Sequence, residues 1–160
     1  MFSSDEIELA DSLLEEAIRL DPNRSAGWLW GGSAKVLLGD HQTAIDYLQR
    51  ALRLSPLTPH IFFAHGLLAS AYFFLGNYEE GLKCAADALR HFPSYLGALR
   101  TAMACHAMLG NIEAAQKLWQ QVALLSPSDR VSETRKRAPF RRDQDLEKLQ
   151  EAYRLAGMPE

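Results

Sequence analysis

This 160-residue chain lacks a recognisable secretory signal, a membrane-spanning run and an expected disulfide. Its start has no basic segment followed by an apolar core and a small-residue cleavage site, so no secretory signal is recognised. The most apolar run, residues 61–76, is shorter than the roughly 20 residues that span a bilayer, and His65 and Ser70 interrupt it. The only cysteines, Cys84 and Cys105, are expected to stay thiols. These absences predict a cytoplasmic protein that does not cross a membrane.

Motifs of catalysis are missing as well. The chain contains no P-loop, no Gly-rich dinucleotide fingerprint, no HExxH motif and no nucleophile elbow. Its histidines and cysteines lack the paired C-x-x-C or H-x-x-x-H spacing of a metal site, and His65 and His106 fall on predicted core positions. We therefore predict a chain that is not an enzyme and that binds no metal and no cofactor.

Charge is low overall but unevenly distributed. The formal net charge is −3, while residues 1–24 hold seven acidic and two basic side chains (net −5) and residues 130–142 hold six basic and one acidic (net +5). The basic segment lacks the interleaved aromatics of a single-strand binder, so nucleic acid is not the expected partner. The two segments are expected to attract each other within one molecule, or to attract the opposite ends of neighbouring molecules.

What the chain does contain is one short corner that occurs three times. The copies LGDHQTAI, LGNYEEGL and LGNIEAAQ begin at Leu38, Leu75 and Leu109. In each copy a proline follows the corner glycine by 17 residues, and these prolines, with Pro22 before them, are 34, 37 and 34 residues apart. Fixed offsets of this kind identify a repeat unit. The glycine and proline pairs are Gly39 and Pro56, Gly76 and Pro93, and Gly110 and Pro127.

The residue types at each corner indicate what one repeat is. Glycine accepts the left-handed conformation that lets the last carbonyls of a helix be capped, so a helix should end at each corner. The next residue is expected to cap the following helix by accepting from its free N–H groups. These capping residues are Asp40, Asn77 and Asn111. The second helix runs on until proline excludes helical geometry from the residue before it. Each repeat is therefore a helical hairpin, and hairpins must stack to bury both of their apolar stripes.

This pattern resembles the tetratricopeptide repeat. The fullest match is residues 25–58, and residues 62–95 and 96–129 match more loosely. In the first of these units the family's key positions are taken by Trp28, Gly32, Gly39, Ala44, Leu48, Ala51 and Pro56. The resemblance implies an all-α fold, an α–α superhelix in the form of a right-handed solenoid. It also implies protein or peptide binding.

We predict a single domain with unequal ends. Residues 5–24 have the pattern of the second helix of a repeat without its partner helix, which favours a fragment of a longer protein or a partner at that end. A last helix over residues 143–156, capped by Asp143 and ended by Gly157, is expected to close the stack. The predicted parts are a half repeat at 5–24, units at 25–58, 62–95 and 96–129, and a basic loop with a C-terminal capping helix at 130–160.

The ending APFRRDQDLEKLQEAYRLAGMPE supports a second resemblance. Together with the repeats, it is similar to the C-terminal tetratricopeptide region of bacterial class III adenylate cyclases. A similar ending follows winged-helix transcriptional regulators that carry the same repeats. The resemblance implies a regulatory segment in signal transduction, with a catalytic or DNA-binding domain upstream.

A candidate binding site lies along the inner face that the first helices of the hairpins should line. Helical spacing places an apolar row there with one cation, and an apolar groove suits an amphipathic helix of a partner, of the upstream domain or of the chain's own end. The predicted groove residues are Trp30, Ser33, Leu37, Phe63, Leu67, Ser70, Phe74, Arg100 and Thr101. The cation is Arg100, so the several basic residues that grip acidic C-terminal peptides in this family are missing. Two alternatives stay open: Trp30, Phe63 and Phe74 form core between repeats, or the chain is a structural module that self-associates into a homo-oligomer.

Overall fold

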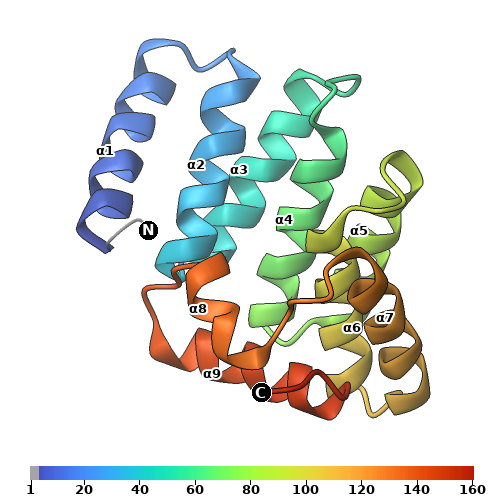
Figure 1. Ribbon diagram of the computed structural model, residues 1–160. Helices are drawn as coiled ribbons and strands as arrows, with labels where there is room; N and C mark the ends of the chain where they lie inside the picture. Colours follow the sequence, from blue (N-terminus) through green and yellow to red (C-terminus); the bar gives the residue numbers. More distant parts are fainter. Residues whose placement is uncertain (1–3) are drawn as a thin grey trace.

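A computed structural model describes residues 4–160, and Figure 1 shows that the regular elements of this part of the chain are all helices, without strands. Seven long helices run up and down in order along the stack, and a shorter C-terminal region folds back across them. The long helices are α1 (Ser4–Leu20), α2 (Ser25–Leu38), α3 (His41–Leu54), α4 (Ile61–Phe74), α5 (Tyr78–His91), α6 (Leu96–Met108) and α7 (Ile112–Leu125). The C-terminal region contains a 3-10 helix, η1 (Val131–Glu133), then α8 (Thr134–Arg137) and α9 (Asp143–Leu155).

The long helices form three hairpins preceded by one unpaired helix. The hairpins are α2 with α3, α4 with α5 and α6 with α7, and α1 packs against α2. The first helices also contact one another, α2 with α4 and α4 with α6, so they form one continuous wall. This arrangement confirms the predicted all-α superhelix of stacked hairpins.

The three corners have the predicted backbone but only one of the predicted side-chain caps. Gly39, Gly76 and Gly110 have positive φ angles of 87°, 81° and 78°. Asp40 accepts a hydrogen bond from the Thr43 N–H at 3.4 Å. The prediction of the same bond is wrong for Asn77 and Asn111, whose side chains make no capping hydrogen bond. Acidic residues in the first turns of α5 and α7 stabilise those helix starts through the helix dipole instead.

Helices within a hairpin approach closely because small residues lie at their crossing. A Cβ atom on Gly32 of α2 would lie 2.6 Å from Cγ of Leu48 on α3, so a larger residue there would have to displace the Leu48 side chain. Opposite it, Ala44 and Leu48 are completely buried. The hydrophobic core runs on from this crossing through α4 and α6 to α9.

The C-terminal helix α9 lies across the ends of the first helices (Figure 1). Arg142 donates from Nη1 to the carbonyl of Gly39 at 2.9 Å, and Lys148 Nζ donates to the carbonyls of Phe73 and Phe74 at 2.9 and 3.1 Å. These cations face the negative ends of α2 and α4, where a positive charge is stabilising. The predicted N-cap was wrong, because Arg142 precedes the helix and Asp143 lies inside its first turn without a capping bond.

Charges of the two oppositely charged segments meet within the molecule. Arg141 of the basic segment pairs with Glu8 of α1. On the same helix, Asp11 and Glu15 bind Lys35 of α2 at 2.8 and 2.6 Å, and these bonds raise the pKa of Lys35 although its burial alone would lower it. The attraction expected from the sequence is therefore made in part inside one molecule.

No helix within residues 4–160 is long and apolar enough to cross a membrane. Cys84 and Cys105 are both free thiols, as expected. Burial raises the pKa of Cys84 to about 11 and that of Cys105 to about 12. Both side chains are therefore protonated near neutral pH and are poor nucleophiles.

The corner glycines provide a test of the fold. We expect Gly76→Ala and Gly110→Ala each to lower the free energy of unfolding by about 1–2 kcal/mol, because an L-residue is strained at positive φ and nothing lies within 4 Å of either added Cβ. Chemical denaturation measures the change. Asn77→Ala and Asn111→Ala are the matched controls, and their effect should stay within about 0.5 kcal/mol. Equal losses of unfolding free energy in the asparagine and glycine variants would contradict the role given to the positive-φ glycines at the corners.

Candidate binding groove

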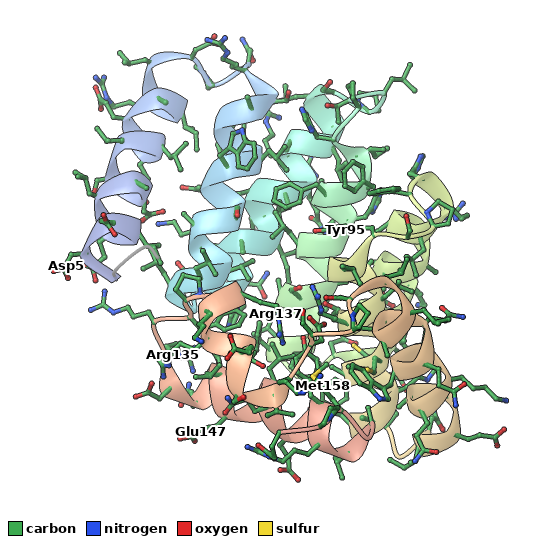
Figure 2. All side chains as sticks on the ribbon, in the orientation of Figure 1. Asp5, Tyr95, Arg135, Arg137, Glu147 and Met158 are labelled. Atoms are coloured by element: carbon green, nitrogen blue, oxygen red, sulfur yellow. The ribbon has the colours of Figure 1, made fainter. Side chains whose placement is uncertain are left out.

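A pocket of about 280 Å³ lies on the inner face between the first helices and the C-terminal region. Eight of the nine predicted groove residues line it: Ser33, Leu37, Phe63, Leu67, Ser70, Phe74, Arg100 and Thr101. The sequence did not predict the lining residues Val36, Tyr95, Gly97, Thr134, Arg137, Ala138, Phe140, Leu149 and Tyr153. Figure 2 labels two of these, Tyr95 of the α5–α6 turn and Arg137 of α8. Most of the unpredicted residues therefore belong to the C-terminal region.

Trp30 lies beside this pocket rather than in its wall. Its side chain is 47% exposed, and its ring centroid lies 5.5 Å from that of Phe63 at a tilted angle. Phe63 is half-buried, whereas Phe74 is buried. The alternative that these aromatics belong to the core between repeats therefore applies to Phe74 but not to Trp30.

The C-terminal region fills one end of the groove. Phe140 is 7% exposed and packs edge-on against Phe74, with ring centroids 5.0 Å apart. The next residue, Arg141, donates its backbone N–H to the carbonyl of Leu37 at 2.9 Å. One of the occupants expected for the groove was the chain's own last helix. The structure instead places the loop before that helix in the groove and places α9 across the helix ends.

A buried pair of side chains joins α3 to α9 beside this loop. His41 of α3 and Asp145 of α9 lie 2.9 Å apart, Nε2 to Oδ2, and the His41 ring stacks on Phe74. Burial lowers the pKa of His41 below its ordinary value, although Asp145 acts in the opposite direction. His41 Nδ1 has no hydrogen-bond partner, which fits a neutral ring that donates from Nε2. These two residues are 104 positions apart, so no local pattern could predict their pairing.

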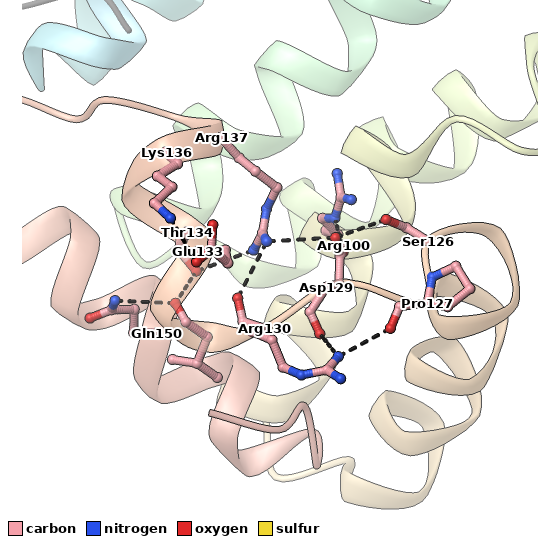
Figure 3. A network of polar contacts seen from close by, with 11 residues as sticks. Arg100, Ser126, Pro127, Asp129, Arg130, Glu133, Thr134, Lys136, Arg137 and Gln150 are labelled. Carbon is pink, nitrogen blue, oxygen red and sulfur yellow. Dashed lines mark hydrogen bonds and ion pairs between the residues drawn. The ribbon is translucent and has the colours of Figure 1, made fainter.

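Arg100, the predicted cation of the groove, is held by an acidic partner (Figure 3). Its Nε lies 2.7 Å from Oδ2 of Asp129, whose other oxygen accepts from the Ser126 hydroxyl at 2.9 Å. Arg137 approaches the same carboxylate at 3.5 Å. Burial alone would raise the pKa of Asp129, but the hydrogen bonds from Arg100 and Ser126 lower it on balance. Arg100 therefore ties α6 to the loop after α7.

The rest of the pocket is mainly apolar. Ser70 and Thr101 lie 3.2 Å apart, Oγ to Oγ1, and link α4 to α6 at the base of the groove. Among residues 4–160 no group of three or more His, Cys, Asp or Glu side chains is arranged to hold a metal ion. The walls are mainly aliphatic and aromatic, and they suit the apolar side chains of a bound segment.

The fold and the groove together define a class, an all-helical scaffold of stacked hairpins that offers a binding surface. A family model described as tetratricopeptide repeat matches residues 3–59 and 67–130. The match covers most of the chain, so the chain belongs to the tetratricopeptide repeat family, as the corner pattern predicted. This family forms protein–protein interaction modules. No enzymatic family was found, and a search of curated proteins gave no match.

Solved structures of the same fold are similar to this chain at low sequence identity. A crystal structure of MamA is 16% identical, with a TM-score of 0.68 over 98% of this chain and 96% of that chain. The first TPR of Spaghetti (RPAP3), bound to an HSP90 peptide, is 22% identical, with a TM-score of 0.61 over 84% and 96%. YrrB, a TPR protein with an unusual peptide-binding site, is 18% identical, with a TM-score of 0.62 over 96% and 79%. At these identities the similarity shows the fold alone.

The loop in the groove leads to a stability prediction. We expect Phe140→Ala to lower the free energy of unfolding by about 3 kcal/mol, because it removes a buried ring that packs on Phe74. Amide hydrogen exchange should also accelerate in α9, since the loop holds that helix in place. Arg135→Ala, which removes only an exposed ion pair with Asp143, is the control. Unchanged exchange in α9 would show that the loop does not anchor it.

The buried histidines lead to a pH prediction. Burial lowers the pKa of His41, His65 and His106 in the folded chain. Above the ordinary histidine pKa of about 6.5 both folded and unfolded forms are neutral, and below it the unfolded chain binds protons more readily. We therefore expect the free energy of unfolding to decrease as the pH falls from about 7 to about 5.

Denaturant titrations across this range measure the effect. The free energy of unfolding should depend less steeply on pH in His41→Asn, because one of the three contributing histidines is then missing. A flat profile in the unchanged protein, or the same slope in the variant, would contradict this account of His41.

Proposed function

We propose that this chain is a non-catalytic protein-binding module that takes an apolar segment of a partner into the open end of its groove, beside Trp30, Phe63 and Leu67. The observation that carries the proposal is the half-exposed indole of Trp30 next to an apolar pocket. Exposed tryptophan is unfavourable in water, and tryptophan is enriched among residues that dominate binding energy. The proposed mechanism is recognition of an amphipathic helix by its apolar side chains.

Two properties of the groove support apolar rather than acidic recognition. The pocket volume of about 280 Å³ is at the lower limit for ligand sites and suits a few anchor side chains. Arg100 is engaged by Asp129, so it is not available as the anchor of a carboxylate clamp. The RPAP3 domain binds an HSP90 peptide and YrrB has a peptide-binding site, and these neighbours support a peptide or protein partner for a chain of this fold.

We further propose that the module is the regulatory or scaffolding C-terminal region of a bacterial adenylate cyclase-type signalling protein in the cytoplasm. The proposal rests on the resemblance of the ending. Residues of this ending contribute to the fold. Phe140 and Arg141 enter or border the groove, and Leu146 and Leu149 are buried. The alternative is the corresponding region of a winged-helix transcriptional regulator. The reading frame upstream of this sequence decides between them.

Groove variants test the binding function. Peptides selected from a library of amphipathic helices for binding to the folded chain would serve as ligands. We expect Trp30→Ala and Leu67→Ala each to weaken their affinity tenfold or more, about 1.4 kcal/mol, because both remove apolar contact area at the groove.

Leu57→Ala is the matched control, because Leu57 is 94% exposed and is not among the residues that line the groove. Circular dichroism should show that all three variants stay folded. Affinities that change less than twofold in both groove variants would reject the groove as the binding site.

A further inference from the structure

A segment of the chain itself lies in the groove where the partner is proposed to bind. We call residues 138–142, which join α8 to α9, the strap. Figure 1 shows this segment passing the end of α2 before α9 begins. Phe140 of the strap packs edge-on against Phe74, and both side chains line the groove. The strap therefore covers one end of the proposed binding surface.

The strap has no helical residues and is held in the way a bound peptide is held. Arg141 donates its backbone N–H to the Leu37 carbonyl at 2.9 Å, and Arg142 donates from Nη1 to the Gly39 carbonyl at 2.9 Å. Both acceptors lie at the end of α2, where carbonyl groups lack partners within the helix. The ion pair of Arg141 with Glu8 is exposed and adds little stability. One buried ring and hydrogen bonds to one helix end are thus the main contacts of the strap.

The chain on either side of the strap has contacts of its own. Before the strap, Val131 donates its N–H to the Pro159 carbonyl at 2.9 Å, and Thr134 is buried. After it, Leu146 and Leu149 of α9 are buried, and α9 packs against α6. Displacing the strap therefore loosens α9 without detaching it from the stack.

The surface beneath the strap continues a row of side chains on α4. Leu67, Ser70 and Phe74 follow Phe63 by four, seven and eleven residues, and all four line the groove. Eleven residues of helix span about 16 Å, which is about three turns. Phe63 and Leu67 are partly exposed, whereas Phe140 covers Phe74. A partner helix laid along α4 can therefore contact the whole row only after Phe140 has left.

The ring that lies there now indicates which side chain fits the covered end. Phe74 contacts the His41 ring in a stacked arrangement, with centroids 4.7 Å apart, and the Phe140 ring edge-on, with centroids 5.0 Å apart. Edge-to-face contact of aromatic rings is favourable beyond the area that it buries. An aromatic side chain of a partner is therefore best suited to take the place of Phe140.

We propose that the strap competes with the partner for the groove. An amphipathic helix that binds along α4 displaces Phe140 and places an aromatic side chain of its own on Phe74. This inference rests on the proposed function and adds how that site is regulated. The closed strap lowers the affinity for every partner that needs Phe74, and a helix with an aromatic residue as its last anchor offsets this loss.

Two synthetic peptides test the proposal with the full chain. Both form amphipathic helices of about four turns with leucines at the first two anchor positions, and the last anchor is phenylalanine in one and alanine in the other. The phenylalanine peptide should bind at least fivefold tighter. Its binding should also remove the protection of the Arg141 amide against hydrogen exchange, because the bond to Leu37 is then broken. Isothermal titration calorimetry measures the affinities, and nuclear magnetic resonance measures the exchange.

Removal of the strap's ring is the second test. Phe140→Ala should bind the phenylalanine peptide at least fivefold tighter than the unchanged chain does, because the competing ring is gone. Ile45→Ala is the matched control, since it also shortens a buried side chain but lies on α3 and does not line the groove. Its affinity should change less than twofold. Circular dichroism checks that both variants fold, and the exchange measurement on the unchanged chain needs neither variant.

Three results would overturn the proposal and leave the groove function standing, provided that Trp30→Ala and Leu67→Ala still weaken binding. They are an Arg141 amide that stays protected in the complex, equal affinity of the two peptides, and weaker binding by Phe140→Ala, which would make Phe140 part of the binding wall. If neither peptide binds the unchanged chain or Phe140→Ala, the groove function itself is rejected, and this inference with it.

Discussion

The close crossing of two helices at small residues is the constraint on which the structure depends. A side chain at Gly32 would clash with that of Leu48, and Ala44 beside them is completely buried. Close contact gives each hairpin its fixed shape, and the positive-φ glycines at the corners let the chain return in the opposite direction. The wall of first helices, and with it the groove, follows from repeating this unit.

The groove is a shared surface rather than an empty channel. Phe140 and the backbone of Arg141 take one end, while Trp30 and Phe63 remain accessible at the other. The charged groups that line it are already engaged, since Arg100 and Arg137 both lie against the carboxylate of Asp129. Recognition in the remaining part must therefore depend on apolar contact and on shape, and a partner gains little from adding negative charge.

Regular parts of the fold were predictable because they depend on local offsets. The spacing of Gly39, Gly76 and Gly110 to their prolines indicated the corners, the hairpins and the side that faces inward. The position of Phe140 was not predictable, because it lies in a basic segment without helical periodicity and its partner Phe74 is far away in sequence. The capping role expected of Asn77 and Asn111 was wrong since residue type alone does not set side-chain direction.

The cross-links made by α9 change how the stack should respond to stress. In an array whose repeats touch only their neighbours, a terminal unit can fray while the others persist. Here Arg142 holds the end of α2, Lys148 holds the end of α4, and α9 also contacts α6. The helix α9 and the residue before it thus contact the first helix of all three hairpins. We therefore expect the three hairpins to unfold together rather than one at a time.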